Sequence, residues 1–288
     1  MRIRPIKTRD AAALLPLFPL AFPDRVITLR EVREQLSAAA YSLLAEIDSQ
    51  TVGFVVAMPV PGLPDQLDLS GAVAVDRRRQ GIGTALLQGL VAHLRPQGYH
   101  TLTYALTDSH APVAYFLPQR GFILHHEEWE LHRPGDLAIP PIYLPYGYSR
   151  RQLTRLAAAA TFRRLYDESF GPHPWYQPYG DEELLHLFRQ QGLPQFLCQG
   201  ELPVGFIWSW VDRTGLGIIE PVGIIPTHQG QGLGRQLILS ALLGFPPGAI
   251  PQVKIGAWHS NAAAIHLYQS LGFRRVHTIT HLQLRIGE

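Results

Sequence analysis

The sequence predicts a mixed α/β fold that is built twice along the chain. Three short landmarks recur after 151 or 152 residues: Val52-Gly53-Phe54 as Val204-Gly205-Phe206, Gly81-Ile82-Gly83 as Gly232-Leu233-Gly234, and Gly121-Phe122 as Gly272-Phe273. Unrelated landmarks that share one spacing indicate a duplicated unit. The length of 288 residues agrees, because a domain takes roughly 150 residues.

The boundary between the copies is predicted near Pro140. Residues 132–141 contain Pro134, Gly135, Pro140 and Pro141, which break both helices and strands. We therefore expect an N-terminal domain over 1–138 and a C-terminal domain over 139–288.

Each copy begins with a predicted β-hairpin and a third strand. Residues 43–60 read as two strands around a turn at 48–50, and residues 196–210 repeat the pattern. The third strand covers 67–75 in the first copy and 217–225 in the second, and it leads into a glycine-rich turn.

Apolar residues at helical spacing follow each turn. They are Leu86, Leu87, Leu90, Val91 and Leu94 in the first copy, and Leu237, Ile238, Ala241 and Leu242 in the second. A further strand, a short helix ending at Gly121 or Gly272, and a final strand over 122–131 or 273–284 complete each copy. The predicted result is a mixed sheet with helices packed on it.

Composition excludes several classes of function. The 25 basic and 23 acidic residues nearly balance, which is not typical of a nucleic-acid-binding protein. The single cysteine, Cys198, cannot form an intramolecular disulfide and suits a reducing compartment. The apolar run 11–23 contains three prolines and is too short to span a bilayer. We expect a cytoplasmic protein without a membrane anchor.

The two glycine turns predict anion sites. Each lies between a strand and a helix, where glycines let a ligand approach the backbone and the first helical N–H groups point outward. The nucleotide-triphosphate loop requires Gly-Lys, and neither lysine of this chain follows a glycine. The dinucleotide fingerprint requires a third glycine, where Leu86 and Leu237 stand. A plain helix-start turn is the remaining alternative.

Two motifs of the second copy together resemble the GNAT superfamily of N-acetyltransferases. One runs from Ile224-Ile225-Pro226 through Gln229-Gly230-Gln231-Gly232-Leu233-Gly234, and the other runs from Asn261 to Phe273. The resemblance covers nearly the whole chain, as a tandem of the mycothiol-synthase type. It implies acetyl-coenzyme A as cofactor, with its pyrophosphate on the turn and its pantetheine arm along the preceding strand.

The resemblance assigns candidate cofactor-binding residues in both copies. In the second copy these are Val222, Ile224, Ile225, Gln229, Gly230, Gln231, Gly232, Leu233, Gly234, Arg235 and Asn261. In the first copy they are Val73, Arg78, Arg79, Gln80, Gly81, Gly83 and Thr84. Backbone amides near Ile224 and Ile225 are also expected to polarise the acetyl carbonyl.

The catalytic candidates are Tyr268 and Glu220. The resemblance places Tyr268 near the sulfur of the cofactor, where a phenol can protonate the leaving thiolate. Glu220 is a carboxylate in an apolar strand, and burial would raise its pKa toward that of a useful base. The alternatives are a core aromatic for Tyr268, an ordinary N-cap for Asn261, and a structural carboxylate or an ammonium anchor for Glu220. Water can also carry the proton in this family.

The first copy departs from the pattern at the catalytic positions. His110 stands where the second copy has Asn261, and Leu117 stands where it has Tyr268, with Pro118 next to it. Val75 also replaces Pro226. We expect the first copy to bind coenzyme A weakly or to serve as a scaffold, and the chemistry to take place in the second copy.

The acceptor site is predicted from aromatic residues. Trp175 and Tyr176 lie in a proline-rich loop, and Trp208 with Trp210 share one face of a strand. Core packing is the alternative for each of them. No metal is expected, because the runs of histidine and glutamate lack ligand spacing.

The predicted function is acetyl-coenzyme A-dependent N-acetyl transfer to an amine of a small molecule or peptide, by direct attack in a ternary complex. The alternative is a non-catalytic acyl-coenzyme A-binding or sensing protein. No nucleic-acid or membrane partner is expected, and the sequence does not indicate an oligomeric state.

Overall fold

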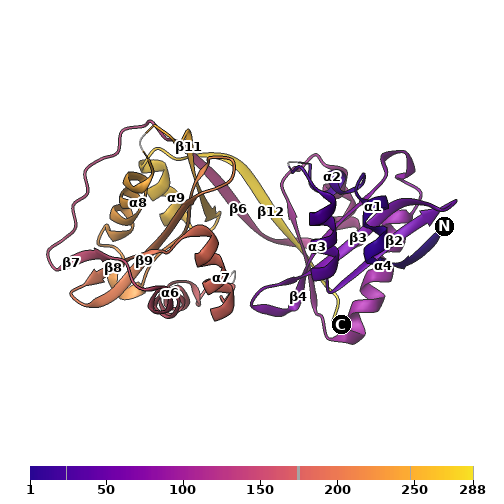
Figure 1. Ribbon diagram of the computed structural model, residues 1–288, viewed down its shortest axis with the longest axis horizontal. Coiled ribbons are helices and arrows are strands. Elements are labelled where there is room, and N and C mark those ends of the chain that lie inside the picture. Colours follow the sequence, from indigo (N-terminus) through magenta and orange to yellow (C-terminus); the bar gives the residue numbers. More distant parts are fainter. Residues whose placement is uncertain (24, 174–175, 247, 288) are drawn as a thin grey trace. The chain divides into compact units, whose positions relative to one another are not determined.

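The computed structural model describes residues 1–23, 25–173, 176–246 and 248–287. The chain forms two compact units (Figure 1). Unit 1 contains Met1–His125 and His281–Glu288, and unit 2 contains His126–Thr280. Each unit is a mixed sheet covered by helices, so the predicted mixed α/β fold is confirmed.

Unit 1 carries strands in the order β1-β2-β3-β4-β5, with the end of β12 after β5. The strands are β1 (Arg2–Pro5), β2 (Tyr41–Ile47), β3 (Gln50–Val60), β4 (Leu63–Val73), β5 (Thr101–Leu106) and β12 (Arg274–Arg285). The helices are α1 (Ala11–Leu14), α2 (Phe18–Ala21), α3 (Leu29–Ala38), α4 (Ile82–Leu94) and α5 (Pro112–Phe116). β1 to β4 pair antiparallel, and β4 pairs parallel with β5.

The sheet of unit 1 buries both faces. Side chains alternate across a strand, so Leu43 and Ala45 of β2 pack with α4 while Leu44 packs with α1, α2 and α3. The helices before β2 were not predicted, and three prolines interrupt the apolar run 11–23 that contains α1 and α2.

Unit 2 repeats this plan with the strand order β6-β11-β10-β9-β8-β7. Its strands are β6 (Ile123–Pro134), β7 (Tyr148–Arg151), β8 (Gln195–Gln199), β9 (Leu202–Val211), β10 (Gly217–Ile224) and β11 (Gln252–Trp258). Its helices are α6 (Arg155–Phe170), α7 (Asp181–Gln191), α8 (Leu233–Gly244) and α9 (Ala262–Ser270). β10 pairs parallel with β11, as β4 does with β5.

The final strand of each repeat contributes to the unit built mainly from the other repeat. β6 pairs antiparallel with β11 of unit 2, from Gln252↔Pro134 to Trp258↔Glu128. The end of β12 joins unit 1, where Ile286 N–H donates to His100 O at 2.8 Å. The predicted division at 138/139 separates the repeats along the chain and stays a prediction. The compact units divide the chain elsewhere. Sequence analysis did not predict this division, because hydrophobic spacing does not show which sheet a strand joins.

A buried arginine fastens β6 inside unit 2. Arg133 is 1% exposed, and its guanidinium donates to the carbonyls of Leu271, Leu137 and Ala138 at 2.8–2.9 Å. Leu271 is the C-cap of α9, and carbonyls at the end of a helix have no partners within the helix. The Arg133 guanidinium donates to one of these carbonyls and places a positive charge at the negative end of the helix. A side chain from the first repeat therefore fixes the end of a helix of the second.

None of the helices in the described ranges is long and apolar enough to cross a membrane.

Candidate active site

The glycine turn of unit 2 connects β10 to α8. Gly230 and Gly232 have φ of 76° and 74°, a region that favours glycine, and α8 begins at Leu233. The side chain of Gln229 donates to Ile224 O at 2.8 Å and so closes the turn. The amides of the first turn of α8 form the positive end of a twelve-residue helix.

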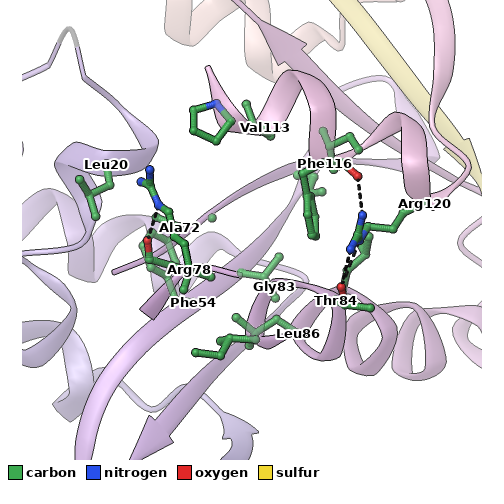
Figure 2. Close-up of a pocket in the computed structure, with 18 of the residues that line it drawn as sticks. Leu20, Phe54, Ala72, Arg78, Gly83, Thr84, Leu86, Val113, Phe116 and Arg120 are labelled. Carbon is green, nitrogen blue, oxygen red and sulfur yellow. Dashed lines mark hydrogen bonds between the residues drawn. The ribbon is translucent and has the colours of Figure 1, made fainter. Parts of the chain in front are cut away.

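Unit 1 contains the same turn with different side chains. Arg78 takes the place of Gln229, and its Nε donates to Val73 O at 3.1 Å (Figure 2). Gly81 has a φ of 80° and precedes α4, and Arg79 has a φ of 63° where unit 2 has Gly230. The backbone conformation is thus kept even where the glycine is not.

A cavity of about 410 Å³ opens beside the turn of unit 1. Arg120 holds its wall, since it donates to Thr84 Oγ1 at 2.7 Å and to Phe116 O at 3.0 Å (Figure 2). The Arg120 guanidinium also lies 3.9 Å from the centre of the Phe116 ring. A Cβ at Gly83 would lie 3.2 Å from that ring, so glycine leaves room for it. The cavity is lined by basic residues at the turn and by leucines farther in.

The two units differ at one position of the strand before the turn. In unit 2, Ile207 pairs with Val222 and Ser209 pairs with Ile219, so Glu220 and Pro221 stand together opposite Trp208. This is a β-bulge, which redirects side chains locally. In unit 1 the equivalent pairing runs from Gly53↔Val73 to Pro59↔Leu67 without a shift, and Ser70 occupies the place of Glu220.

Glu220 combines access to solvent with a raised pKa. Its side chain is exposed at the wall of a cavity, while the surrounding protein displaces most of the bulk water. This desolvation, with the negative charge of Glu128 next, raises the pKa of Glu220 to about 7. Lys254 opposes the effect and Glu130 adds to it. A carboxyl of this kind can accept a proton near neutral pH.

Tyr268 lies on α9 in the core of unit 2. The residue is 6% exposed, and burial raises the pKa of its phenol, with a further contribution from the charge of Glu220. The neutral phenol is therefore the stable form, as a proton donor requires. The equivalent Leu117 of unit 1 is 2% exposed, and α5 ends one residue before it.

Asn261 serves as the N-cap of α9. Its Oδ1 accepts from Ala264 N–H at 3.1 Å, which is the structural role considered as an alternative. The amide of Ile225 donates to Val204 O at 3.0 Å. That amide is engaged with β9, and polarisation of a carbonyl by the amides near Ile224 and Ile225 stays a prediction.

The other predicted cofactor residues of unit 2 surround the turn. Arg235 Nη1 donates to Ser270 Oγ at 3.0 Å, and Gln231 accepts from the Tyr148 hydroxyl at 3.1 Å. Ile224 and Leu233 are buried beside the turn, Val222 is half-buried, and Gly234 faces Leu267. In unit 1, Gln80 donates to Asp76 O at 3.4 Å.

A second cavity, of about 300 Å³, lies in unit 2 next to Glu220. Its lining is aromatic and polar: Tyr166, Gln177, Tyr179, Glu183, Leu187, Gln191, Trp208, Trp210 and Glu220. Trp208 is 2% exposed and donates to Gly192 O at 3.0 Å, so it is also a core residue. Trp210 is half-buried, with its ring 5.5 Å from that of Trp208.

The predicted acceptor loop contributes in part. Tyr176 is outside the cavity lining and donates to Asp167 Oδ1 at 2.6 Å, while Trp175 lies outside the described residues. Tyr166 and Tyr179 line the cavity in the position expected for residues of that loop. Burial raises the pKa of Tyr179 to about 12, and the charge of Glu220 adds to the effect. Sequence reasoning missed Tyr166, although its spacing to Phe162 and Phe170 places all three on one face of α6.

Comparisons with known proteins identify the family. The model of the acetyltransferase (GNAT) family matches residues 12–122 and 159–273. A mycothiol acetyltransferase from Thermomonospora curvata is 31% identical over 260 residues, which cover 87% of this chain and 82% of that protein. Another, from Thermobifida fusca, is 29% identical over 278 residues, covering 85% and 84%.

Solved structures share the fold at low identity. A GCN5-related N-acetyltransferase from Sphaerobacter thermophilus has a TM-score of 0.71 and 19% identity, covering 99% of this chain and 95% of that chain. A tandem GNAT protein from the clavulanic acid biosynthesis pathway has a TM-score of 0.70 and 16% identity, covering 100% and 99%. The predicted tandem arrangement is confirmed.

Proposed function

The chain belongs to the acetyltransferase (GNAT) family and is an N-acetyltransferase, and from this premise we propose that unit 2 transfers acetyl groups to a small-molecule amine. The observation that carries the proposal is the bulge at Glu220, which brings a carboxylate to the wall of a cavity in unit 2. In unit 1 the equivalent stretch of β4 pairs with β3 without this bulge, and Leu117 stands in place of Tyr268.

The glycine turns fit the phosphates of acetyl-coenzyme A. Added Cβ atoms at Gly230 and Gly232 would meet nothing within 4 Å, so the backbone is open to a ligand, and the helix amides offer donors. Residues 229–235 would hold the pyrophosphate in unit 2, and residues 78–84 would hold it in unit 1. When bound, acetyl-coenzyme A supplies the thioester whose acetyl group is transferred.

In unit 2, Glu220 accepts a proton and Tyr268 donates one. Glu220 accepts a proton from the ammonium of the acceptor, and the freed amine forms a C–N bond as the C–S bond breaks. The Tyr268 hydroxyl donates its proton to the leaving sulfur, and the phenolate recovers a proton from the attacking nitrogen, which loses its second proton as the amide forms. The aromatic wall of the cavity, with its acidic residues, suits an acceptor that presents an ammonium beside an apolar or sugar-like ring.

Unit 1 supports a different role. Its cavity retains the turn and is larger, but leucine and serine stand in place of Tyr268 and Glu220. We infer that it binds acyl-coenzyme A without turning it over.

Calorimetry with acetyl-coenzyme A tests both parts, because it counts sites. We expect two sites of unequal affinity, and no binding would refute the proposal. A panel of amines, including an acceptor related to mycothiol, is then followed by release of free thiol. Binding without thiol release from any amine would favour the non-catalytic alternative.

A further inference from the structure

A strand of the first repeat brings a carboxylate next to Glu220. β11 lies between β10, which carries Glu220, and β6, which carries Glu128. Along β6, Glu128 stands opposite Trp258 and Glu130 stands opposite Gly256. β6 comes from the first repeat by sequence, yet this part of it is within unit 2.

The carboxylates of Glu128 and Glu220 both lie close to Gly256 of β11. A Cβ at this position would lie 2.5 Å from Glu128 Oε1 and 3.6 Å from Glu220 Oε1. Glycine leaves open the space that the Glu128 carboxylate occupies. The two side chains therefore approach one another over the same residue of β11.

The remaining charged and titratable groups around Glu220 come from several elements. Lys254 of β11 lies 2.8 Å from Glu130 Oε2, and His132 Nε2 of β6 lies 2.7 Å from Glu130 Oε1. Lys254 pairs directly with Glu130, and its positive charge also acts on Glu220 and Glu128. Tyr166, Tyr179 and Glu183 face Glu220 across the cavity, and Tyr268 approaches from α9.

We propose that Glu128 is a positioning residue for Glu220: its negative charge strengthens the hold of the Glu220 carboxylate on the proton taken from the acceptor amine. The inference rests on the proposed function of Glu220 as the base. A nearby negative charge disfavours the ionised form of a carboxyl, and after desolvation the charge of Glu128 is the next largest cause of the raised pKa of Glu220. The first repeat thereby contributes to chemistry performed in the second unit.

The test is a titration of Glu220 in the full chain by NMR of glutamate labelled at the side-chain carboxyl carbon. Loss of a signal in Glu220→Gln assigns it. We expect Glu128→Gln to lower the midpoint of Glu220 by about one pH unit, since one nearby like charge is removed. The acidic limb of the pH–rate profile should move in the same direction.

Two further variants separate charge from structure. Glu127→Gln removes an equal charge from the adjacent position of β6, whose side chain points to the other face, and should leave the midpoint unchanged. Gly256→Ala keeps every charge but forces the Glu128 carboxylate away, and should lower the midpoint as Glu128→Gln does.

An unmoved midpoint in Glu128→Gln, or an equal shift in Glu127→Gln, would overturn the role of Glu128. Because the titration needs no substrate, its result is distinct from that of the proposed function. The latter fails if the wild-type chain releases no thiol with any amine.

Discussion

Units 1 and 2 share a turn and differ in what surrounds it. Both place a residue with positive φ two positions before the glycine that caps the helix, and both close the turn with a side chain on the carbonyl that ends the strand. Unit 2 adds a bulge with Glu220 and a nine-residue α9 with Tyr268, whereas unit 1 has an unshifted strand and a five-residue α5. Under the proposed function, phosphate binding and catalysis are therefore separable properties of one fold.

The largest expected effect comes from Tyr268, whose equivalent in unit 1 is Leu117. Tyr268→Phe should lower kcat by about 100-fold or more, because it removes the proton donor and leaves the packing nearly unchanged. Leu117→Met is the matched change in unit 1 and should leave kcat unchanged. Free-thiol release measures both, and equal losses would place chemistry in both units.

The carboxylate on the bulge gives the next effect. Glu220→Gln should lower kcat by roughly 100-fold at pH 7 and above, whereas Ser70→Ala in unit 1 should have no effect. In the wild-type chain, kcat/KM should fall as the pH decreases through about 7, because Glu220 then gains the proton that prevents it from acting as a base. A profile that is flat between pH 5 and pH 8, roughly the usual working range, would contradict the assignment.

Changes in unit 1 should affect binding alone. Arg120→Ala removes the hydrogen bonds to Thr84 and Phe116 and the contact with the ring, so the cavity wall loses its support. We expect the weaker calorimetric site to lose about tenfold in affinity, the equivalent of about 1.4 kcal/mol. Turnover should be unchanged, and a parallel fall in kcat would show that the units do not work independently.

The smallest effect tests the backbone of the two turns. Arg79→Gly should raise the free energy of unfolding by about 1 kcal/mol, because φ near 63° is costly for any residue with a Cβ. Gly230→Ala should lower the free energy of unfolding by a similar amount. The added Cβ would touch no neighbouring atom, but the positive φ of this position is costly for a residue with a Cβ. Chemical denaturation measures both, and changes of the same sign would refute the shared conformation.

The duplication, the mixed sheets, both turns and the difference at Tyr268 and Leu117 could be predicted from the sequence. These features depend on residue type and spacing, which are local. The loss of water that raises the pKa of Glu220 was also foreseeable, since a carboxylate in an apolar strand is partly desolvated.

Which strands pair and which side chains approach one another could not be predicted, because this depends on contacts between distant parts of the chain. The bulge at Glu220 depends on register with β9, the cavity depends on α6 and α7 bringing Tyr166 and Tyr179 to Trp210, and β6 joins β11 through long-range pairing. Glu128 is one of four titratable side chains in a row in the sequence, and nothing local distinguishes it from Glu127. Its place over Gly256 follows from pairing between residues more than a hundred positions apart, which no spacing along the chain encodes.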